Sequence, residues 1–355
     1  MSPNPEERLR LVQVVPHDSP PFGRLCEAYA RAAEEADFHV QTFVLGKPHA
    51  QPLAGFDYLG ESRLHRTGRI AARIAAMVDE PEEVSLVLCH RYRAFRVALE
   101  SGFSTCRLVA VAHEYGMLSS WRRRVHRRLF AREARFAGVS RGVAEELAEV
   151  TGFLLMLPNL LDLQRADTER LTRDTARRQL GVDRDDFVIG TVGRLHYKKR
   201  PDMAVAAVRR FRQHGSHSVR HLFIGRGDEV KGLQAEQDRV VGFVENAAAL
   251  MPGLDVLLHT GDVEGFGMVL LEAMAAGVAV AATDSPGPRE VLGDLGFFPA
   301  SDDADGFAAA LQMAQQASAE HLQAGIERAR DLYSIPAMSR RLVALADFVA
   351  EPEQG

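Results

Sequence analysis

Short apolar runs alternate with helix-like stretches along the whole chain, and this alternation limits the possible folds more than any other feature. The expected strands lie at residues 9–15, 40–45, 85–89, 108–113, 135–139, 153–157, 187–193, 222–225, 240–244, 256–259 and 278–283. The expected helices include residues 24–36, 64–78, 142–150, 203–213, 266–276, 306–316 and 336–349. Strands that alternate with helices pair in parallel, because each connection has to cross over the sheet. The pattern predicts an α/β protein built from βαβ units.

The chain of 355 residues is too long for one ordinary hydrophobic core, so two domains are expected. We predict a first domain at residues 1–160 and a second at 183–335. Residues 161–182 are polar and rich in Arg, which is typical of a linker or an interdomain helix. Residues 336–355 are expected to form a helix that packs back on the first domain.

The composition is that of a soluble globular protein, with 46% apolar and 26% charged residues. The sequence has no run approaching the ~20 apolar residues that span a membrane, and its N-terminus lacks the pattern of a signal peptide. The scattered Cys26, Cys89 and Cys106 lack metal-ligand spacing, so a reducing cytoplasm is expected. A sequence pI of about 6.2 argues against nucleic acid as a partner.

Two carboxylates flank the start of a strongly apolar helix, in the stretch Glu264-Gly-Phe-Gly-Met-Val-Leu-Leu-Glu272. Glu272 falls among apolar positions, where an ionised carboxylate needs partners that replace water. A polar ligand is one such partner; an Arg of the protein, or exposure of this part of the helix, is the alternative. Gly265 and Gly267 flank Phe266 at the helix start, where backbone amides can approach an anion.

A basic turn follows the first strand of the second domain, in Gly193-Arg-Leu-His-Tyr-Lys-Lys199-Arg-Pro201. Arg194 and Lys199 can converge on one anion from this short loop, the first through paired hydrogen bonds and the second as a point charge. The alternative is a solvated basic turn before a helix that begins at Pro201.

Together these motifs resemble the retaining glycosyltransferases of family 4, which have the GT-B fold. The resemblance rests on the two glutamates, the Gly193-Arg-Leu-x-x-x-Lys199 turn, Gly225-Arg-Gly-Asp228, Pro158-Asn159 and Gly242-Phe243-Val244. It covers most of residues 107–300. It implies two Rossmann-like, doubly wound domains that face each other across a cleft.

The resemblance also implies a nucleotide-diphosphate sugar as the donor, bound mainly by the C-terminal domain. Arg194 and Lys199 would stabilise the departing diphosphate. Glu264 would hydrogen-bond hydroxyls of the donor sugar, and Glu272 those of the ribose. Further donor-binding positions are Gly193, Gly225, Gly242, Phe243, Val244, Gly265, Phe266, Gly267, Met268 and Val269, with residues 242–245 bordering the base.

In the first domain, the resemblance points to His113, which ends an apolar strand and would position the transferred sugar. A core or loop histidine is the alternative. The loop His17-Asp-Ser-Pro-Pro-Phe-Gly23 departs from the glycine-rich loop of many relatives, because it has one Gly and two Pro. Gly23 is still expected to let backbone approach the donor phosphate or the acceptor, and His17 and Asp18 either meet the acceptor or form an exposed turn.

The strongest charge cluster is the stretch from Trp121 to Arg141, with eight Arg and one acidic residue. We assign Trp121, Arg122, Arg123, Arg124, Arg127 and Arg128 to an anionic acceptor or an anionic membrane surface. The alternative is an ordinary helix that packs through its apolar edge and keeps a solvated basic face.

Other polar residues are weaker candidates for a functional site. His214, His217 and His221 lack accompanying carboxylates, and Asp302-Asp303 is better explained as a turn and helix cap than as a metal pair. Ser140 and Ser285 lack the surroundings of a nucleophile. No metal ion and no cofactor are expected.

The sequence therefore predicts a cytoplasmic glycosyltransferase, in peripheral contact with the inner face of the membrane through the basic cluster. It would use a UDP- or GDP-sugar and an envelope glycan or lipid-linked acceptor of the lipopolysaccharide or exopolysaccharide type. Two alternatives are a GT-B epimerase or phosphorylase, and a non-catalytic, membrane-docked sensor of a nucleotide sugar. The nucleobase, the sugar and the acceptor stay open.

Overall fold

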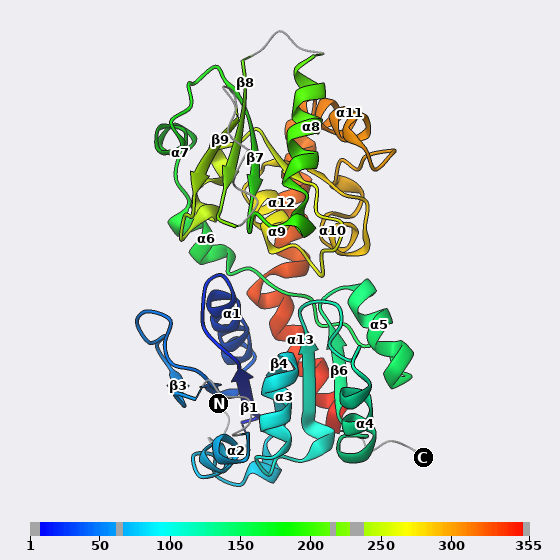
Figure 1. Cartoon of the computed structure of the whole chain (residues 1–355). Coiled ribbons are helices and arrows are strands. Elements are labelled where there is room, and N and C mark those ends of the chain that lie inside the picture. The colour runs from blue at the N-terminus through cyan, green and yellow to red at the C-terminus, as the bar shows by residue number, and fades with distance from the viewer. Residues whose placement is uncertain (1–7, 62–66, 214–217, 228–237, 351–355) are drawn as a thin grey trace. The chain divides into compact units, whose positions relative to one another are not determined.

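The computed structural model describes residues 8–61, 67–213, 218–227 and 238–350 (Figure 1). The chain divides into two compact units, the first made of residues 1–160 and 333–355 and the second of residues 161–332. Each unit is an α/β domain around its own parallel sheet.

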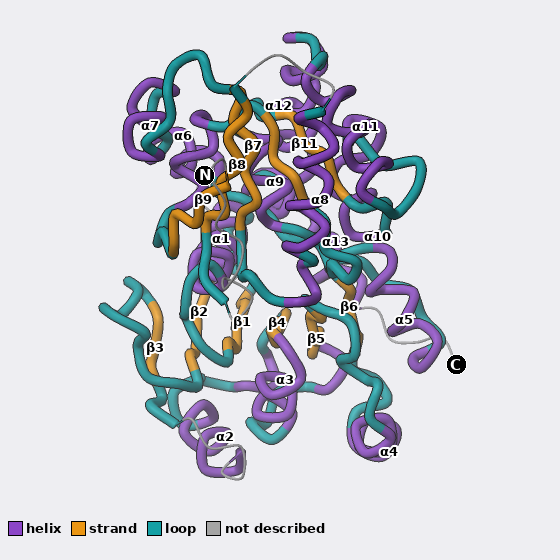
Figure 2. The backbone as a smooth tube through the Cα atoms, turned by 45° about the horizontal axis from the view of Figure 1, so that its top comes forward, coloured by secondary structure: helices purple, strands orange, loops and turns teal. Residues whose placement is uncertain are grey.

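The sheet of the first unit has the strand order β3-β2-β1-β4-β5-β6, which Figure 2 shows from left to right. Its strands are β1 (Arg10–Val15), β2 (His39–Val44), β3 (Phe56–Tyr58), β4 (Leu86–His90), β5 (Leu108–Ala112) and β6 (Arg135–Gly138). Its helices are α1 (Phe22–Glu35), α2 (Thr67–Ala75), α3 (Arg91–Leu99), α4 (Trp121–Phe130), α5 (Arg141–Thr151) and α13 (Ile335–Ala350). Every residue of β4 and β5 is buried, as expected when helices cover both faces of a parallel sheet.

The sheet of the second unit has the order β11-β10-β7-β8-β9. Its strands are β7 (Phe187–Val192), β8 (Val219–Ile224), β9 (Asp238–Gly242), β10 (Val256–His259) and β11 (Ala279–Ala282). Its helices are α6 (Leu163–Glu169), α7 (Arg173–Leu180), α8 (Pro201–Arg212), α9 (Met268–Ala275), α10 (Pro286–Leu292), α11 (Ala304–Gln315) and α12 (Ala319–Tyr333). Apolar side chains of α8 and α11 share one core cluster with this sheet.

The strand order reverses direction at one place in each sheet, between β1 and β4 in the first unit and between β7 and β10 in the second. In open α/β sheets, the connections on the two sides of such a reversal leave toward opposite faces, and ligands bind at the carboxyl ends of the two strands that flank it. The loops after β1, β4, β7 and β10 are therefore the places where each unit is built to hold a ligand.

Residues 153–157 do not form the expected strand. They contribute one isolated bridge, between Gly138 and Met156. Phe153 instead stacks on Phe348 of α13, with ring centroids 5.4 Å apart. The apolar character of this stretch thus serves the contact with the C-terminal helix, which belongs to the first unit and packs on α1.

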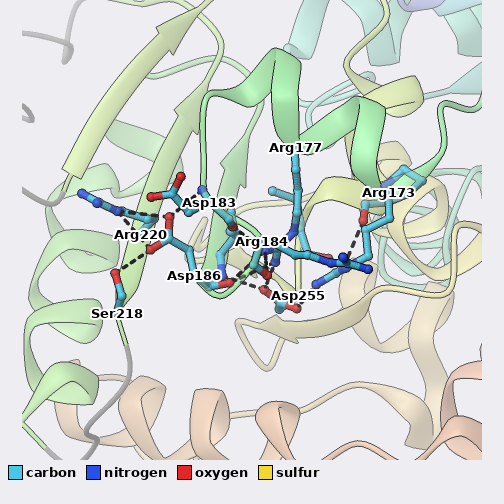
Figure 3. Close-up of polar contacts among 11 residues, drawn as sticks. Arg173, Arg177, Asp183, Arg184, Asp186, Ser218, Arg220 and Asp255 are labelled. Carbon is cyan, nitrogen blue, oxygen red and sulfur yellow. Dashed lines mark hydrogen bonds and ion pairs between the residues drawn. The ribbon is translucent and has the colours of Figure 1, made fainter.

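Residues 161–182 are an integral part of the second unit and not a linker, because they form α6 and α7 there. Arg177 of α7 is 3% exposed and donates to the carbonyl oxygens of Asp183, Arg184 and Asp186. It also donates to the carboxylate of Asp255 at 2.7 Å (Figure 3). These contacts lie where β7 and β10 begin, at the opposite end of the sheet from the ligand-binding edge.

Candidate functional site

The turns after β7, β8 and β9 interlock through glycines. The Gly225 amide donates to the Gly242 carbonyl at 2.8 Å, and the Gly193 amide donates to the Ile224 carbonyl at 2.9 Å. A Cβ on Gly225 would lie 1.8 Å from the Gly193 oxygen, so no other residue fits there. Gly193 and Gly242 have positive φ and open space around them. The predicted glycines thus shape this edge of the sheet.

The loop from Arg194 to Arg200 is held by its neighbours. Its Leu195 is buried, and the Leu195 amide donates to the Arg226 carbonyl at 3.0 Å. The Thr260 hydroxyl, directly after β10, lies 2.9 Å from the carbonyl oxygens of both Lys199 and Arg200. The loop after β7 is thereby fixed to the loop after β10, across the point where the strand order reverses.

Lys199, Glu264 and His259 meet at this point. The Lys199 ammonium donates to Glu264 Oε2, and His259 Nε2 lies 3.6 Å from the same oxygen. Burial would raise the pKa of the Glu264 carboxyl, but the charge of Lys199 and a hydrogen bond from the Phe266 amide hold it below its ordinary value. Burial, reinforced by the charge of Lys199, lowers the pKa of His259 to about 4. At neutral pH the group is a charged pair beside a neutral imidazole.

Arg194 lies on the same loop as Lys199, and its side chain is exposed. In the described part of the chain, no carboxylate forms an ion pair with it. The structure therefore does not bring Arg194 to Glu264. Of the two predicted cations on this loop, Lys199 is already paired and Arg194 is accessible to an anion.

The N-terminus of α9 adjoins Glu264. Gly265, Phe266 and Gly267 are buried, and Gly267 has the positive φ that lets the chain turn into the helix. Glu272 shares a half-buried helix face with Met268 and Val269, because these positions are three and four residues apart. Although Glu272 falls among apolar positions in the sequence, it is only half-buried, since Leu270, Leu271, Ala273, Met274 and Ala275 are the residues of α9 that are buried.

An exposed aromatic ring stands at the carboxyl ends of β8 and β9. Phe243 is 54% exposed, and the guanidinium of Arg226 lies 4.5 Å from its ring centroid. Val244 beside it is half-buried. Such a flat surface can stack on a planar group, in keeping with the predicted position of the base at residues 242–245.

In the first unit, four side chains form one row of hydrogen bonds. Gln13 Oε1 lies 2.9 Å from His90 Nε2, and His90 Nδ1 lies 2.9 Å from His113 Nε2. The other nitrogen of His113 lies 3.0 Å from Asn159 Oδ1. Burial lowers the pKa of His113 well below its ordinary value, aided by His90 and Arg91. Both ring nitrogens of the predicted His113 are thus engaged within the unit.

The loop after β1 is held by internal contacts. The Asp18 carboxylate accepts from the Tyr58 hydroxyl at 2.7 Å and from the His49 amide at 3.0 Å, and Asp18 is buried, so the alternative of an exposed turn is wrong for Asp18. A Cβ on Gly23 would lie 2.2 Å from the Asp18 carbonyl oxygen, which accounts for this glycine by packing. His17 is half-buried and contacts Ser19.

Helix α4 exposes its apolar side chains and directs two arginines inward, which is the reverse of the usual arrangement of an amphipathic helix. Trp121 is 69% and Leu129 66% exposed, while Arg123 and Arg127 point inward. Arg123 donates to the Met117 carbonyl at 3.0 Å, and Arg127 donates to the Thr151 carbonyl at 3.3 Å. The alternative in which this helix packs through its apolar edge is therefore wrong.

Several polar groups have structural roles. His221 is buried against Thr191, and Asp303 caps α11 by accepting from the Gly306 amide at 2.8 Å. Ser140 caps α5. His214, His217 and Asp228 lie outside the described residues. Within those residues, no three or more His, Cys, Asp or Glu side chains are grouped to hold a metal ion.

The sequence did not single out His90, His259, Arg226 or Gln13. His90 and His259 are the last residues of buried strands, so a polar residue at the end of an apolar strand is the sequence feature that could have identified them. The roles of Gln13 and Arg226 depend on contacts with residues distant in the sequence, and no local sequence pattern shows such contacts.

Residues 172–331 match the family "Glycosyl transferases group 1". The chain is 46% identical over 104 residues to a phosphatidyl-myo-inositol mannosyltransferase of Mycolicibacterium smegmatis, covering 26% of this chain and 27% of that protein. It is 31% identical over 168 residues to a D-inositol 3-phosphate glycosyltransferase of Corynebacterium aurimucosum, covering 42% and 40%. The matches thus span well under half the length of these curated relatives.

Solved structures resemble the chain over nearly its full length. A glycosyltransferase from Rickettsia africae has a TM-score of 0.78 at 16% identity, covering 98% of this chain and 100% of that one. HepE from Anabaena, solved in complex with UDP and glucose, has a TM-score of 0.74 at 17% identity, covering 96% and 100%. The fold is therefore that of the GT-B glycosyltransferases, and the similarity to the family of glycosyl transferases group 1 lies in residues 172–331.

Proposed function

We propose that the protein is a retaining glycosyltransferase that moves a sugar from a nucleotide-diphosphate sugar to an envelope glycan or a lipid-linked acceptor. The observation that carries this proposal is the Lys199–Glu264 pair at the carboxyl ends of β7 and β10. These residues come from loops 65 positions apart, yet they meet where the sheet is built to bind a ligand.

In this proposal each charged group has one task. Lys199 and the exposed Arg194 bind the diphosphate and stabilise the charge that grows on it as the sugar leaves. Glu264 holds the Lys199 side chain in place and accepts from hydroxyls of the sugar, while Glu272 accepts from those of the ribose. The exposed ring of Phe243 borders the base. His113 of the first unit contacts a substrate hydroxyl.

We propose further that the reaction needs no divalent cation. Arg194 and Lys199 supply the charge that a metal ion supplies to the leaving diphosphate in other transferases. Turnover that is unchanged in excess EDTA agrees with this; turnover that is abolished by EDTA and restored by Mg²⁺ or Mn²⁺ contradicts it.

The donor is open between uridine and guanosine sugars. One relative is named a GDP-mannose-dependent alpha-mannosyltransferase, and one similar solved structure is of a complex with UDP-glucose. A thermal-shift panel of UDP, GDP, ADP and TDP with their sugar conjugates ranks them, because a ligand stabilises the fold with the logarithm of its concentration over Kd.

The reaction itself is tested with a radiolabelled sugar of the best donor and a lipid or glycan extract. Incorporation of label into the extract, with the anomeric configuration of the donor kept, is the expected result. Release of an isomerised sugar nucleotide marks an epimerase, phosphate-dependent turnover marks a phosphorylase, and binding without turnover marks a sensor. Any of these three contradicts the proposal.

We also propose that α4 docks on an anionic lipid surface, which brings the enzyme to its acceptor. The exposed side chains Trp121, Val125, Leu129 and Phe130 form an apolar surface on this helix, and Arg122, Arg124 and Arg128 are exposed around it. Apolar side chains flanked by arginines suit the boundary between acyl chains and acidic headgroups. None of the described helices is long and apolar enough to cross a membrane.

A further inference from the structure

In the row of hydrogen bonds in the first unit, the Gln13 side chain determines which atom donates and which accepts. Gln13 Nε2 lies 3.1 Å from the Cys26 carbonyl oxygen and 3.2 Å from the Thr42 hydroxyl. A carbonyl oxygen only accepts hydrogen bonds, so the amide nitrogen has to face it. The amide oxygen of Gln13 then faces His90 Nε2, and His90 has to carry a hydrogen there.

The position of the hydrogen on His90 in turn determines which nitrogen of His113 donates. Complete burial, reinforced by the charge of Arg91, lowers the pKa of His90 to about 3, so its ring is neutral. With its hydrogen on Nε2, the Nδ1 of His90 is a bare lone pair. It accepts from His113 Nε2, which lies 2.9 Å away. A neutral His113 therefore keeps its lone pair on Nδ1, beside Asn159.

The number of hydrogens in the row ties the charge of His113 to the orientation of Asn159. The row joins Asn159 Oδ1 to Gln13 Oε1 by three contacts, each needing one hydrogen, whereas two neutral rings supply two. With the Asn159 oxygen toward the ring, His113 is an imidazolium. With a neutral ring, the Asn159 amide nitrogen has to face Nδ1. The two orientations occupy the same space and differ by a half-turn of the amide.

The surrounding charges favour the form in which the His90 and His113 rings are both neutral. Arg91, next to His90 in the chain, is held at a φ of +72°, and its guanidinium lies 4.9 Å from the Phe22 ring centroid. That ring contacts His113 edge-on at 5.1 Å. The exposed Glu114 offsets Arg91 only weakly, at 3.9 Å. His17 and Tyr29 are the other titratable groups in ring contact with Phe22 or His90.

We propose that Gln13 and His90 are positioning residues that hold His113 in the form protonated on Nε2. His113 then offers a lone pair on Nδ1 to a substrate hydroxyl, and Asn159 takes the place of that hydroxyl when no substrate is bound. His113 thus accepts a hydrogen bond from the sugar and does not donate one. The role toward substrate rests on the proposed function, whereas the tautomer does not.

Histidine ring nitrogens labelled with ¹⁵N test the tautomer without any substrate. Long-range proton–nitrogen spectra of the full chain at pH 7 should show His90 and His113 both protonated on Nε2 alone. Assignment comes from the spectra of His90→Gln and His113→Gln. Gln13→Met should mix the tautomers of both rings, whereas Thr42→Val, which contacts the same amide, should leave them unchanged. A His113 ring protonated on Nδ1, or one that titrates near pH 6.5, overturns the proposal.

Kinetics separate this proposal from the proposed function. Gln13→Met should lower kcat by about tenfold, the lower end of what partners of a histidine contribute in metal sites. It should leave the Kd of the nucleotide diphosphate unchanged, because the groups assigned to that ligand lie in the second unit. An unchanged kcat in Gln13→Met overturns the positioning role. If the wild type bound no nucleotide diphosphate, the proposed function would be refuted, but the tautomers assigned to His90 and His113 would be unaffected.

Discussion

At the scale of single residues, the chemistry of the second unit depends on how Lys199, Glu264 and His259 share charge. The contact with Glu264 holds the Lys199 ammonium in place. His259 stays neutral beside it because burial and the charge of Lys199 both oppose its protonation. The group therefore adds no second positive charge at neutral pH, and the exposed Arg194 supplies the remaining attraction for an anion.

The lowered pKa of His259 predicts how stability depends on pH. Its pKa is about 4 in the folded chain and 6.5 in the unfolded chain, so between these values only the unfolded chain binds a proton. The free energy of unfolding should fall as the pH drops from 6.5 to 4, by on the order of 3 kcal/mol from this group. Urea unfolding at several pH values measures it. His259→Gln should flatten this slope; parallel curves for variant and wild type would contradict the assignment.

At the scale of secondary-structure elements, α7 shows how buried and exposed arginines differ. Arg173 and Arg177 lie one turn apart and both bond Asp255 (Figure 3). Only Arg177 is buried, and it alone holds the carbonyl oxygens of residues 183, 184 and 186. It thus joins α7 to the segment that leads into β7.

Arg177→Met should therefore lower the free energy of unfolding by about 3–5 kcal/mol, because it removes a buried charged donor from the Asp255 carboxylate and from the carbonyl oxygens of residues 183, 184 and 186. Arg173→Ala removes a half-exposed partner of the same carboxylate and should cost below about 1 kcal/mol. Urea unfolding of both variants at pH 7 compares them. Equal losses would show that Arg177 is not the residue that holds this edge of the sheet.

The orientation of α4 predicts its behaviour toward lipid. The double variant Trp121→Ser/Leu129→Ser should lose binding to vesicles that contain phosphatidylglycerol, while Met313→Ser, which removes an exposed apolar side chain on α11, should keep it. Arg122→Gln/Arg128→Gln should weaken binding by about 2 kcal/mol at low salt. Cosedimentation with vesicles measures all three. Wild-type binding by the first variant, or equal binding to uncharged vesicles, would contradict the docking proposal.

The strands and helices were largely predictable, because buried parallel strands are apolar throughout and helices repeat with a period near 3.6. Residues 153–157 misled the prediction, since the Phe153 side chain stacks on Phe348 of α13, far away in the sequence. The orientation of α4 was not predictable from spacing. The long side chains of Arg123 and Arg127 pack inward, with Arg123 4.8 Å from the Tyr92 ring centroid, and they replace the apolar edge at the interface.

At the scale of the whole molecule, two units with the same strand order carry different chemistry. In the second unit, the loops after β7 and β10 meet through a cation and a carboxylate; in the first, the residues at and after β4 and β5 meet through two histidines. The sequence predicted Lys199 and Glu264 because both follow strands that parallel pairing makes neighbours. It did not predict the row through Gln13 and His90, because their polarity is hidden inside strands that look like core.

The central claim is that Lys199 binds the diphosphate of a nucleotide sugar. Lys198 is its exposed neighbour on the same turn and provides a matched control. Isothermal titration of the nucleotide diphosphate ranked first by thermal shift should give a Kd roughly 10–100-fold weaker for Lys199→Ala, the loss of one charge-assisted hydrogen bond. Lys198→Ala should bind like the wild type. Equal Kd values for the two variants, or no binding of any nucleotide diphosphate by the wild type, would contradict the claim.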